Sequence, residues 1–252
     1  MKPYVAALCG AVLAPGAVGH QLHGILLVNG TASPEWKYVR DVAPASGAVS
    51  PIAGQYEKTI PQFDVHNPNI TCGRNAFDYA NQTETATVLA GSEVGFRVSY
   101  DYQAREEAFF IHPGPGQVYL SRAPNDNLES YRGDGDWFKI AYGGPVSNNE
   151  WSLYFNFTIP ETTPPGRYLM RFEQFWPTTS YNYSQWFINC AHVNIVGPGG
   201  GIPTGFAKFP GTYEVDDPGI LIPENQHVIS GLEPDEMALM EYKPPGPPVW
   251  TG

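Results

Sequence analysis

Charged side chains are scarce in this sequence, and positive ones are the scarcest. Asp, Glu, Lys and Arg make up 15% of the 252 residues, and 14 Lys and Arg stand against 25 Asp and Glu, for a net charge of −11. This balance argues against nucleic acid or an anionic membrane surface as a partner. It is compatible with a neutral partner such as a glycan. Nothing after the N-terminal segment approaches the ~20 consecutive apolar residues of a transmembrane helix.

Common catalytic signatures are missing as well. The sequence has no His-Glu-x-x-His, no Gly-x-Ser-x-Gly, no P-loop and no Cys-x-x-Cys. The usual signatures of hydrolases and nucleotide-binding proteins are therefore absent. A function has to be sought in another constellation of residues.

Long helical periodicity is also lacking, whereas glycine (27) and proline (25) are abundant. Four segments alternate apolar and polar residues with the period of a β-strand. They are 94–100, 151–159, 168–173 and 186–196. Strands separated by Gly/Pro turns predict an all-β protein, an antiparallel β-sandwich of immunoglobulin-like or fibronectin-like type with long loops. No repeat and no linker to a second module is visible, so we expect one domain over 20–252, with 206–252 as a long loop strapped over the sandwich.

The N-terminus has the pattern of a secretory signal peptide. Lys2 precedes an apolar run over 5–14, and Ala17 and Gly19 are small residues at the −3 and −1 positions of a cleavage site. Residues 1–19 are therefore predicted to be a signal peptide, and the protein to be secreted and extracellular. Cleavage after Gly19 would make His20 the first residue of the mature chain. A cleavage site shifted by a few residues is the alternative.

Cysteines and glycosylation sequons agree with export. Of three cysteines, Cys9 leaves with the signal peptide, and the remaining pair, Cys72 and Cys190, implies one disulfide in a secreted chain. Five Asn-x-Ser/Thr sequons are candidate glycosylation sites. They begin at Asn29, Asn69, Asn81, Asn156 and Asn182.

His20 differs from the other histidines because it would carry a free α-amino group. The mature chain would contain six histidines: His20, His23, His66, His112, His192 and His227. A terminal histidine offers its amine and a ring nitrogen to one metal, and one more imidazole completes a planar set of three nitrogens. Such a set suits copper, whereas zinc would favour a tetrahedral one. We interpret His23 as packed or exposed, His192 as buried and hydrogen-bonded, and His66 and His227 as surface residues.

The segment around His112 resembles a known family. Phe110-Ile-His-Pro-Gly-Pro-Gly-Gln-Val-Tyr-Leu-Ser121 is similar to the His-x-Gly-Pro-x-x-x-Tyr-Leu segment of the fungal lytic polysaccharide monooxygenases of auxiliary activity family nine, formerly glycoside hydrolase family 61. Further segments agree in chain order and span almost the whole mature chain. They are His20 with Val28-Asn29-Gly30, Asn69 to Cys72, Val88 to Val94, Trp137 to Ile140, Pro165 to Glu173, Gln185 to Cys190, Asp217 to Gly219 and Tyr242 to Trp250.

The resemblance implies a function and a set of site residues. One copper ion, cycling between Cu(II) and Cu(I), would be held by His20 through its amine and ring and by His112 through its ring. Gln185 would orient the oxygen species, and Tyr242 would lie on a flat substrate face. The implied reaction is oxidative cleavage of cellulose or a related β-1,4-glucan by hydroxylation at C1 or C4. It would need an external electron donor and oxygen or hydrogen peroxide, and a monomer is expected.

Two departures from the family pattern bear on that function. Phe187 stands where the family has a tyrosine placed axially at copper. Strand parity puts Gln185 and Phe187 on one face, opposite Cys190. No histidine follows Glu173 where the family has one close to the metal; Thr178, Asn182 and Tyr183 are the candidate substitutes. A secreted copper-binding or glycan-binding protein with little monooxygenase activity is therefore the alternative, and a plain β-sandwich adhesion domain is a third hypothesis.

Overall fold

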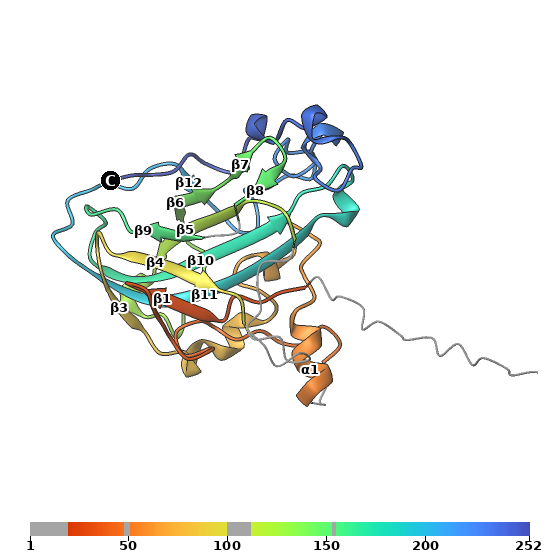
Figure 1. Cartoon of the computed structure of the whole chain (residues 1–252). Coiled ribbons are helices and arrows are strands. Elements are labelled where there is room, and N and C mark those ends of the chain that lie inside the picture. Colours follow the sequence, from red (N-terminus) through yellow and green to blue (C-terminus); the bar gives the residue numbers. More distant parts are fainter. Residues whose placement is uncertain (1–19, 48–50, 100–111, 153–154) are drawn as a thin grey trace, which may run out of the picture.

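The computed structural model describes residues 20–47, 51–99, 112–152 and 155–252. The predicted signal peptide, 1–19, lies outside the described residues. Two β-sheets pack face to face in Figure 1. The larger sheet has the order β12-β6-β5-β10-β11-β3. Its strands are β12 (Phe206–Ala207), β6 (Trp137–Gly143), β5 (Gly116–Arg122), β10 (Gly166–Trp176), β11 (Gln185–Val196) and β3 (Ala86–Leu89).

The smaller sheet has the order β2-β1-β4-β9. Its strands are β2 (Thr31–Ala32), β1 (Ile25–Val28), β4 (Glu93–Arg97) and β9 (Asn156–Thr158). Asn29 and Gly30 connect β1 to β2, and both have positive φ, 49° and 75°. That conformation gives a two-residue hairpin its twist, and Asn-Gly is the pair that adopts it most easily. A separate hairpin joins β7 (Pro145–Ser147) and β8 (Glu150–Trp151).

Pairing is antiparallel except between β11 and β3, so the predicted antiparallel β-sandwich is confirmed. Helices are short. They are α1 (Pro51–Lys58) and the 3-10 turns η1 (Pro68–Ile70), η2 (Ala76–Gln82), η3 (Pro124–Asp126), η4 (Tyr181–Tyr183), η5 (Glu224–Gln226), η6 (Pro234–Glu236) and η7 (Leu239–Glu241). In the described ranges, no helix has the length and apolar character needed to cross a bilayer.

Two of the predicted strands are present as expected, and a third is divided between two sheets. Segment 186–196 is β11, and 168–173 lies within the longer β10. The expectation of one strand over 151–159 is wrong. Its ends belong to different sheets, because Trp151 pairs with Pro145 in the small hairpin while β9 pairs with β4. An alternating pattern identifies extended chain but not the partner strand, so it cannot reveal such a change of sheet.

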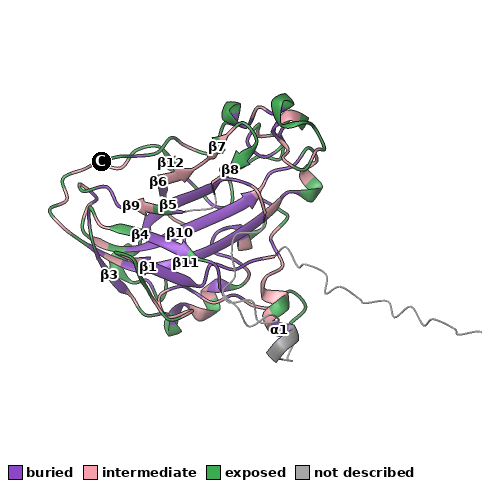
Figure 2. Cartoon of the chain, viewed as in Figure 1, coloured by how far each residue is buried: buried purple, intermediate pink, exposed green. Residues whose placement is uncertain are grey.

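The main core lies between the two sheets. Leu26 and Phe96 of the smaller sheet pack with Met170 and Phe172 of the larger one, all at most 2% exposed. Figure 2 shows the central strands of the larger sheet, β5, β10 and β11, buried along most of their length. Because side chains alternate along a strand, even-numbered residues of β10 point into the sandwich and odd-numbered ones point to the outer face.

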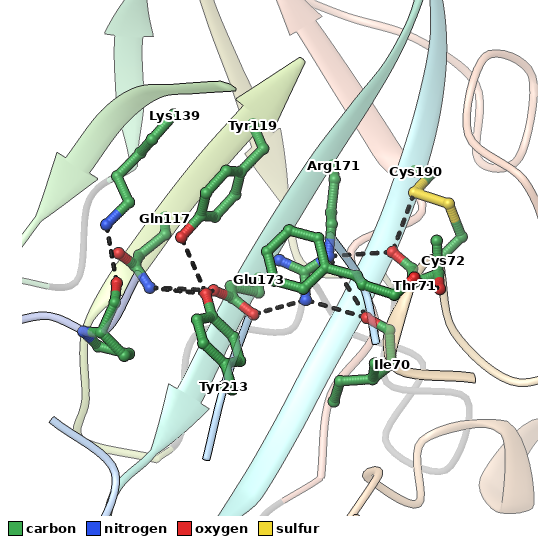
Figure 3. Close-up of polar contacts among 12 residues, drawn as sticks. Ile70, Thr71, Cys72, Gln117, Tyr119, Lys139, Arg171, Glu173, Cys190 and Tyr213 are labelled. Atoms are coloured by element: carbon green, nitrogen blue, oxygen red, sulfur yellow. Dashed lines mark hydrogen bonds and ion pairs between the residues drawn. A yellow bond between two sulfur atoms is a disulfide. The ribbon is translucent and has the colours of Figure 1, made fainter. Parts of the chain in front are cut away.

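The outer face of the larger sheet has a core of its own under long loops. It contains a buried polar network (Figure 3). Arg171 donates to Glu173 Oε2 at 2.6 Å and to the carbonyl of Ile70 at 2.9 Å, and the Tyr213 hydroxyl donates to Glu173 Oε1. Gln117 also donates to Glu173, at 3.0 Å. These bonds satisfy a buried carboxylate and fasten the covering loops to the sheet.

The C-terminal segment crosses the larger sheet along its edge. Trp250 is buried, its ring meets Phe138 edge-on at 5.2 Å, and its amide donates to the carbonyl of Lys139 at 2.7 Å. Lys139 in turn donates its ammonium to the carbonyl of Pro245 at 2.8 Å. The predicted strap over the sandwich is thus what the structure contains, with short 3-10 turns within it.

Candidate metal centre

His20 and His112 lie together at one end of the sandwich. Their ring centroids are 6.2 Å apart. Backbone contacts hold the segment that follows His20. Ser99 N donates to Leu22 O at 2.7 Å, and His23 N donates to the side-chain oxygen of Asn189 at 2.9 Å. The segment is thereby fixed against β11 and next to the end of β4.

The ring nitrogens of these two histidines fit a metal ion. Among the described residues, His20 Nδ1 and His112 Nε2 are buried and have no hydrogen-bond partner. Buried ring nitrogens normally have one. A metal about 2 Å from one nitrogen of each ring would place the ring centroids roughly 6 Å apart, close to the separation found here. Cleavage before His20 would add an amine nitrogen, and three nitrogens are a donor set that suits copper.

No larger set of metal ligands competes with this pair. Across the described ranges, no group of three or more His, Cys, Asp or Glu side chains is placed to hold a metal ion. A site built from side chains alone would therefore have two ligands here. The amine of His20 is the additional donor that the mature chain can supply.

Burial favours the neutral form of both imidazoles. Desolvation lowers the pKa of His20 below its ordinary value, and desolvation together with the nearby His20 lowers the pKa of His112 to about 4. Imidazole binds a metal only in its neutral form. His112 is therefore available as a ligand at neutral and mildly acidic pH, and the pKa of His20 is shifted in the same direction.

The β10–β11 pair forms the floor of the site. Gln174 is opposite Phe187 in the register, and Trp176 is opposite Gln185. Directly opposed residues share a face, so all four point into the same end of the sandwich, and Cys190 points to the other face. The predicted parity of Gln185, Phe187 and Cys190 agrees with this register. Gln185 is half-buried, and its side-chain oxygen has no partner within the described residues.

Two aromatic rings stack against the His112 imidazole. The centroid of the Phe187 ring lies 5.5 Å from that of the imidazole, and Trp176 stacks on the imidazole at 4.8 Å with 11° between the planes. His227 stacks on Trp176 at 5.9 Å. The interpretation of His227 as a surface residue is therefore wrong, because this contact half-buries it and joins the C-terminal loops to the site.

The loop that carries His112 approaches β10 too closely for any side chain at Gly114. A Cβ atom there would lie 1.8 Å from the carbonyl oxygen of Phe175. The amide of Phe175 donates to Pro115 O at 3.2 Å. The lack of a side chain at Gly114 therefore lets the loop lie against the end of β10.

Tyr242 does not occupy the place expected of it. It was expected on an exposed substrate face, but it is 7% exposed, its ring meets Trp151 at 4.9 Å, and its hydroxyl donates to Gly219 O at 2.6 Å. Because ring and hydroxyl are both engaged inside the C-terminal loops, Tyr242 holds those loops together. The expectation of an exposed Tyr242 is wrong.

The candidate substitutes for the missing histidine also differ from one another. Thr178 is buried, and its hydroxyl donates to the carbonyl of Ser180 at 2.6 Å. The hydroxyl is therefore used within the loop that carries it. Asn182 and Tyr183 are exposed in η4, and Tyr183 is 69% exposed. Within the described residues, none of these three hydrogen-bonds to an imidazole. Trp176 and Gln174, by contrast, do contact the His112 segment, the first by stacking on its ring and the second by a hydrogen bond to its carbonyl.

The remaining expectations can be placed on the structure. Cys72 and Cys190 form the predicted disulfide. His23 and His192 are fully buried, as interpreted, and His192 Nε2 accepts from Arg40 at 2.8 Å. His66 is exposed. Four sequon asparagines are exposed and one is half-buried: Asn29, Asn81, Asn156 and Asn182, and Asn69.

Sequence reasoning missed Gln21, Gln174, Trp176 and His227. The alternation of β10 put Gln174 and Trp176 on the face of Phe172, which was the signal available for them. Nothing in the sequence paired that face with His112. Gln21 and His227 come from segments without regular periodicity, so no local pattern could have indicated them.

Comparison with known proteins supplies a family. Residues 20–230 match the profile of "Auxiliary Activity family 9 (formerly GH61)". A lytic polysaccharide monooxygenase of this family from Thermothielavioides terrestris, designated U, is 67% identical over an alignment of 260 positions that covers all of both chains. Another, designated C, from Emericella nidulans is 34% identical over 96% of each chain.

Solved structures agree on the fold. The extended catalytic domain of LPMO9A from H. jecorina superimposes with a TM-score of 0.68, at 22% identity and over 92% of each chain. A cellulose-active polysaccharide monooxygenase from M. thermophila superimposes with a TM-score of 0.62 at 19% identity, over 92% of this chain and all of that one. The fold, the matched residues and the relatives together show that this chain belongs to auxiliary activity family 9, the lytic polysaccharide monooxygenases.

Proposed function

We propose that this chain is a copper-dependent monooxygenase that cleaves cellulose or a related β-1,4-glucan. Membership of the family establishes oxidative attack on a polysaccharide, with an external reductant and an oxygen species as co-substrates. The observation that carries the proposal is the facing pair His20 and His112, with buried nitrogens that lack partners among the described residues. The ion would be held by these two rings and by the amine of His20.

The amine becomes available only if the chain is cut before His20. We propose that residues 1–19 are a signal peptide and that the mature protein, a single domain, is secreted. The family profile begins its match at residue 20, which supports that boundary. The buried disulfide between Cys72 and Cys190 is of the kind that persists in oxidising compartments.

Copper bound at this site supplies one-electron redox chemistry with oxygen or hydrogen peroxide. The protein contributes position and exclusion of water. Phe187 and Trp176 stack on the His112 ring and restrain its orientation. The side-chain amide of Gln185, whose oxygen has no partner among the described residues, would be placed to orient an oxygen species by hydrogen bonding. The proposed outcome is hydroxylation of the glucan at C1 or C4, which would make the glycosidic bond unstable.

The substrate face would be the exposed surface at this end of the sandwich. Tyr183 is 69% exposed and lies two residues before Gln185, while Phe63 is 44% exposed and follows Gln62, whose amide donates to Trp186 O at 2.9 Å. Exposed rings beside the site could stack on sugar rings, a role that the buried Tyr242 cannot fill. Cellulose as the substrate is supported by family membership, and a protein of this fold from M. thermophila is described as cellulose-active.

A copper-binding or glycan-binding protein with little activity is the second candidate. Phe187 offers no hydroxyl, and Thr178 uses its own within the loop. Both features remove proton donors from the surroundings of the site. Changes of this kind around a metal site typically cost 10–100-fold in affinity or activity.

The deciding experiment uses protein that begins at His20 and is loaded with copper. It is incubated with phosphoric-acid-swollen cellulose, ascorbate and hydrogen peroxide, and the products are read by mass spectrometry, with His20→Ala as the control. Oxidised oligosaccharides that are absent with His20→Ala are expected. Tight copper binding without oxidised product on cellulose or other β-glucans would favour the second candidate.

A further inference from the structure

We propose that Gln174 is a positioning residue that sets the His112 segment against the N-terminal segment of His20. The inference rests on the proposed copper site and concerns a residue to which that function gave no role. Gln174 lies near the end of β10, on the face that carries Trp176 and is opposed by Phe187. It is 1% exposed.

Its side-chain amide connects the two segments directly. Gln21 donates its side-chain N–H to Gln174 Oε1 at 2.7 Å, and Gln174 donates its own Nε2 to the backbone carbonyl of His112 at 3.0 Å. Gln21 follows His20 in the chain and is 2% exposed. The residues joined are 153 and 62 positions apart, so one side chain links three distant segments.

Only a residue with both an acceptor and a donor can form this link. The oxygen of Gln174 accepts on the N-terminal side, and its nitrogen donates on the His112 side, which is what a primary amide provides. An apolar residue of the same length would leave a buried N–H of Gln21 and a buried carbonyl of His112 to find other partners. Unsatisfied buried groups are costly, so the segments would shift to reach water or each other.

The hydrogen bonds of Gln174 help to set the spacing between the imidazole rings of His20 and His112. The His112 ring is stacked against Phe187 and Trp176, but stacking contacts restrain the tilt of a ring better than its sliding in the ring plane. The bond from Gln174 holds the backbone of His112 and restrains that sliding. Loss of the bond should therefore alter the donor geometry at the metal more than it alters the fold.

A matched control is available on the opposite face of the same sheet. Gln117 is also fully buried and donates its amide to Glu173 at 3.0 Å and to the Tyr213 hydroxyl at 3.1 Å. Figure 3 shows it in the outer-face network. Gln117→Met should lower stability about as much as Gln174→Met, without touching either histidine segment.

The experiment measures three quantities on protein that begins at His20. They are the copper(II) dissociation constant by calorimetry, the copper(II) electron paramagnetic resonance spectrum, and the melting temperature of the metal-free protein. For Gln174→Met we expect a dissociation constant raised about tenfold or more and a changed copper hyperfine splitting. For Gln117→Met we expect a lower melting temperature with the wild-type spectrum and affinity.

A second variant separates positioning from folding. Gln21→Met leaves β10 intact and removes the other end of the link, so it should reproduce the spectral change even if Gln174→Met does not fold. If the two act as one chain, the double variant should weaken copper binding by less than the product of the single effects.

The possible outcomes separate failure of the positioning role of Gln174 from failure of the proposed copper site. Wild-type protein that binds no copper would overturn the proposed site and this inference with it. Wild-type protein that binds copper, with both glutamine variants matching its affinity and spectrum, would overturn the positioning role alone. A spectral change of equal size in Gln117→Met would also overturn it, because the effect would then follow from general loss of stability.

Discussion

At the scale of single residues, the environment of His112 includes two stacked rings, Trp176 and Phe187. Burial is the largest cause of its pKa of about 4, and these rings contribute to that burial. A metal-binding histidine must be deprotonated. The aromatic cover therefore extends the pH range in which the site can hold a metal.

Truncation of one ring should narrow that range. In Trp176→Ala, water reaches one face of His112, so its pKa should rise towards 6.5 and protons should compete with copper at pH 5. We expect copper affinity to fall severalfold at pH 5 and to change less at pH 7.5, as measured by calorimetry. Trp176→Phe keeps a stacked ring and serves as the control. Equal losses at both pH values in the alanine variant would contradict the explanation.

A second prediction concerns the histidine buried far from the metal. Burial lowers the pKa of His192 to about 3, with a contribution from Arg40, whose Nε donates to His192. Between about 6.5 and 3, the unfolded chain binds a proton that the folded chain does not. Stability should therefore fall as pH drops through this window, by about 1 kcal/mol per pH unit for this group.

His192→Gln removes the titration but keeps an acceptor for Arg40. Its free energy of unfolding, measured by denaturant titration of metal-free protein from pH 7 to 4, should decline less steeply than that of wild type. His66→Gln, at an exposed position, is the control and should keep the wild-type slope. A variant curve parallel to that of wild type would show that His192 does not cause the acid sensitivity.

At the scale of elements, the site depends on how the loop before β5 meets the end of β10. Gly114 permits the approach, since a Cβ atom there would collide with the backbone carbonyl of Phe175. Backbone cannot move aside as a flexible side chain can. The position of His112, two residues earlier, is therefore coupled to this contact.

Gly114→Ala should displace the loop and with it one of the two imidazoles. We expect copper affinity to fall by at least tenfold, while the far-ultraviolet circular dichroism stays that of a β-sandwich. Gly95→Ala in β4 is the matched control. Its Cβ would come closest to the side chain of the exposed Asn156, which can rotate away, and would lie 3.2 Å from the nearest backbone atom, the carbonyl oxygen of Phe155, instead of the 1.8 Å found at Gly114. Unchanged copper binding in Gly114→Ala would mean that the loop tolerates the contact.

At the scale of the whole molecule, the Cys72–Cys190 disulfide fastens the long N-terminal loop to the outer face of the larger sheet. The two cysteines are 118 residues apart. A crosslink over so long a loop removes much of the entropy of the unfolded chain, worth on the order of 4 kcal/mol in the loop-closure model. Cys190 points away from the site, since Phe187 and Gln185 occupy the opposite face of β11.

The double variant Cys72→Ala/Cys190→Ala should therefore lose stability without losing the metal. We expect a clearly lower melting temperature but a copper(II) spectrum like that of wild type at 10 °C. A changed copper spectrum in the folded double variant would show that the outer face influences the site.

The sequence by itself determined the two longest strands and half of the site. Alternation identified β11 and most of β10, and the same period placed Gln185 and Phe187 on one face with Cys190 on the other. These are local properties, since a period of two fixes the direction of a side chain without reference to the rest of the chain. The two histidines followed from the chemistry of a terminal amine and from a motif around His112.

Only the tertiary structure decided which residues surround those histidines. Trp176 and Gln174 reach His112 because the loop before β5 lies against the end of β10, and His227 reaches Trp176 from the C-terminal loops. Tyr242 is buried because its ring packs against Trp151 and its hydroxyl donates a hydrogen bond to the carbonyl of Gly219. Such contacts join segments far apart in the chain, and packing of the whole molecule selects them, so no local pattern carries them.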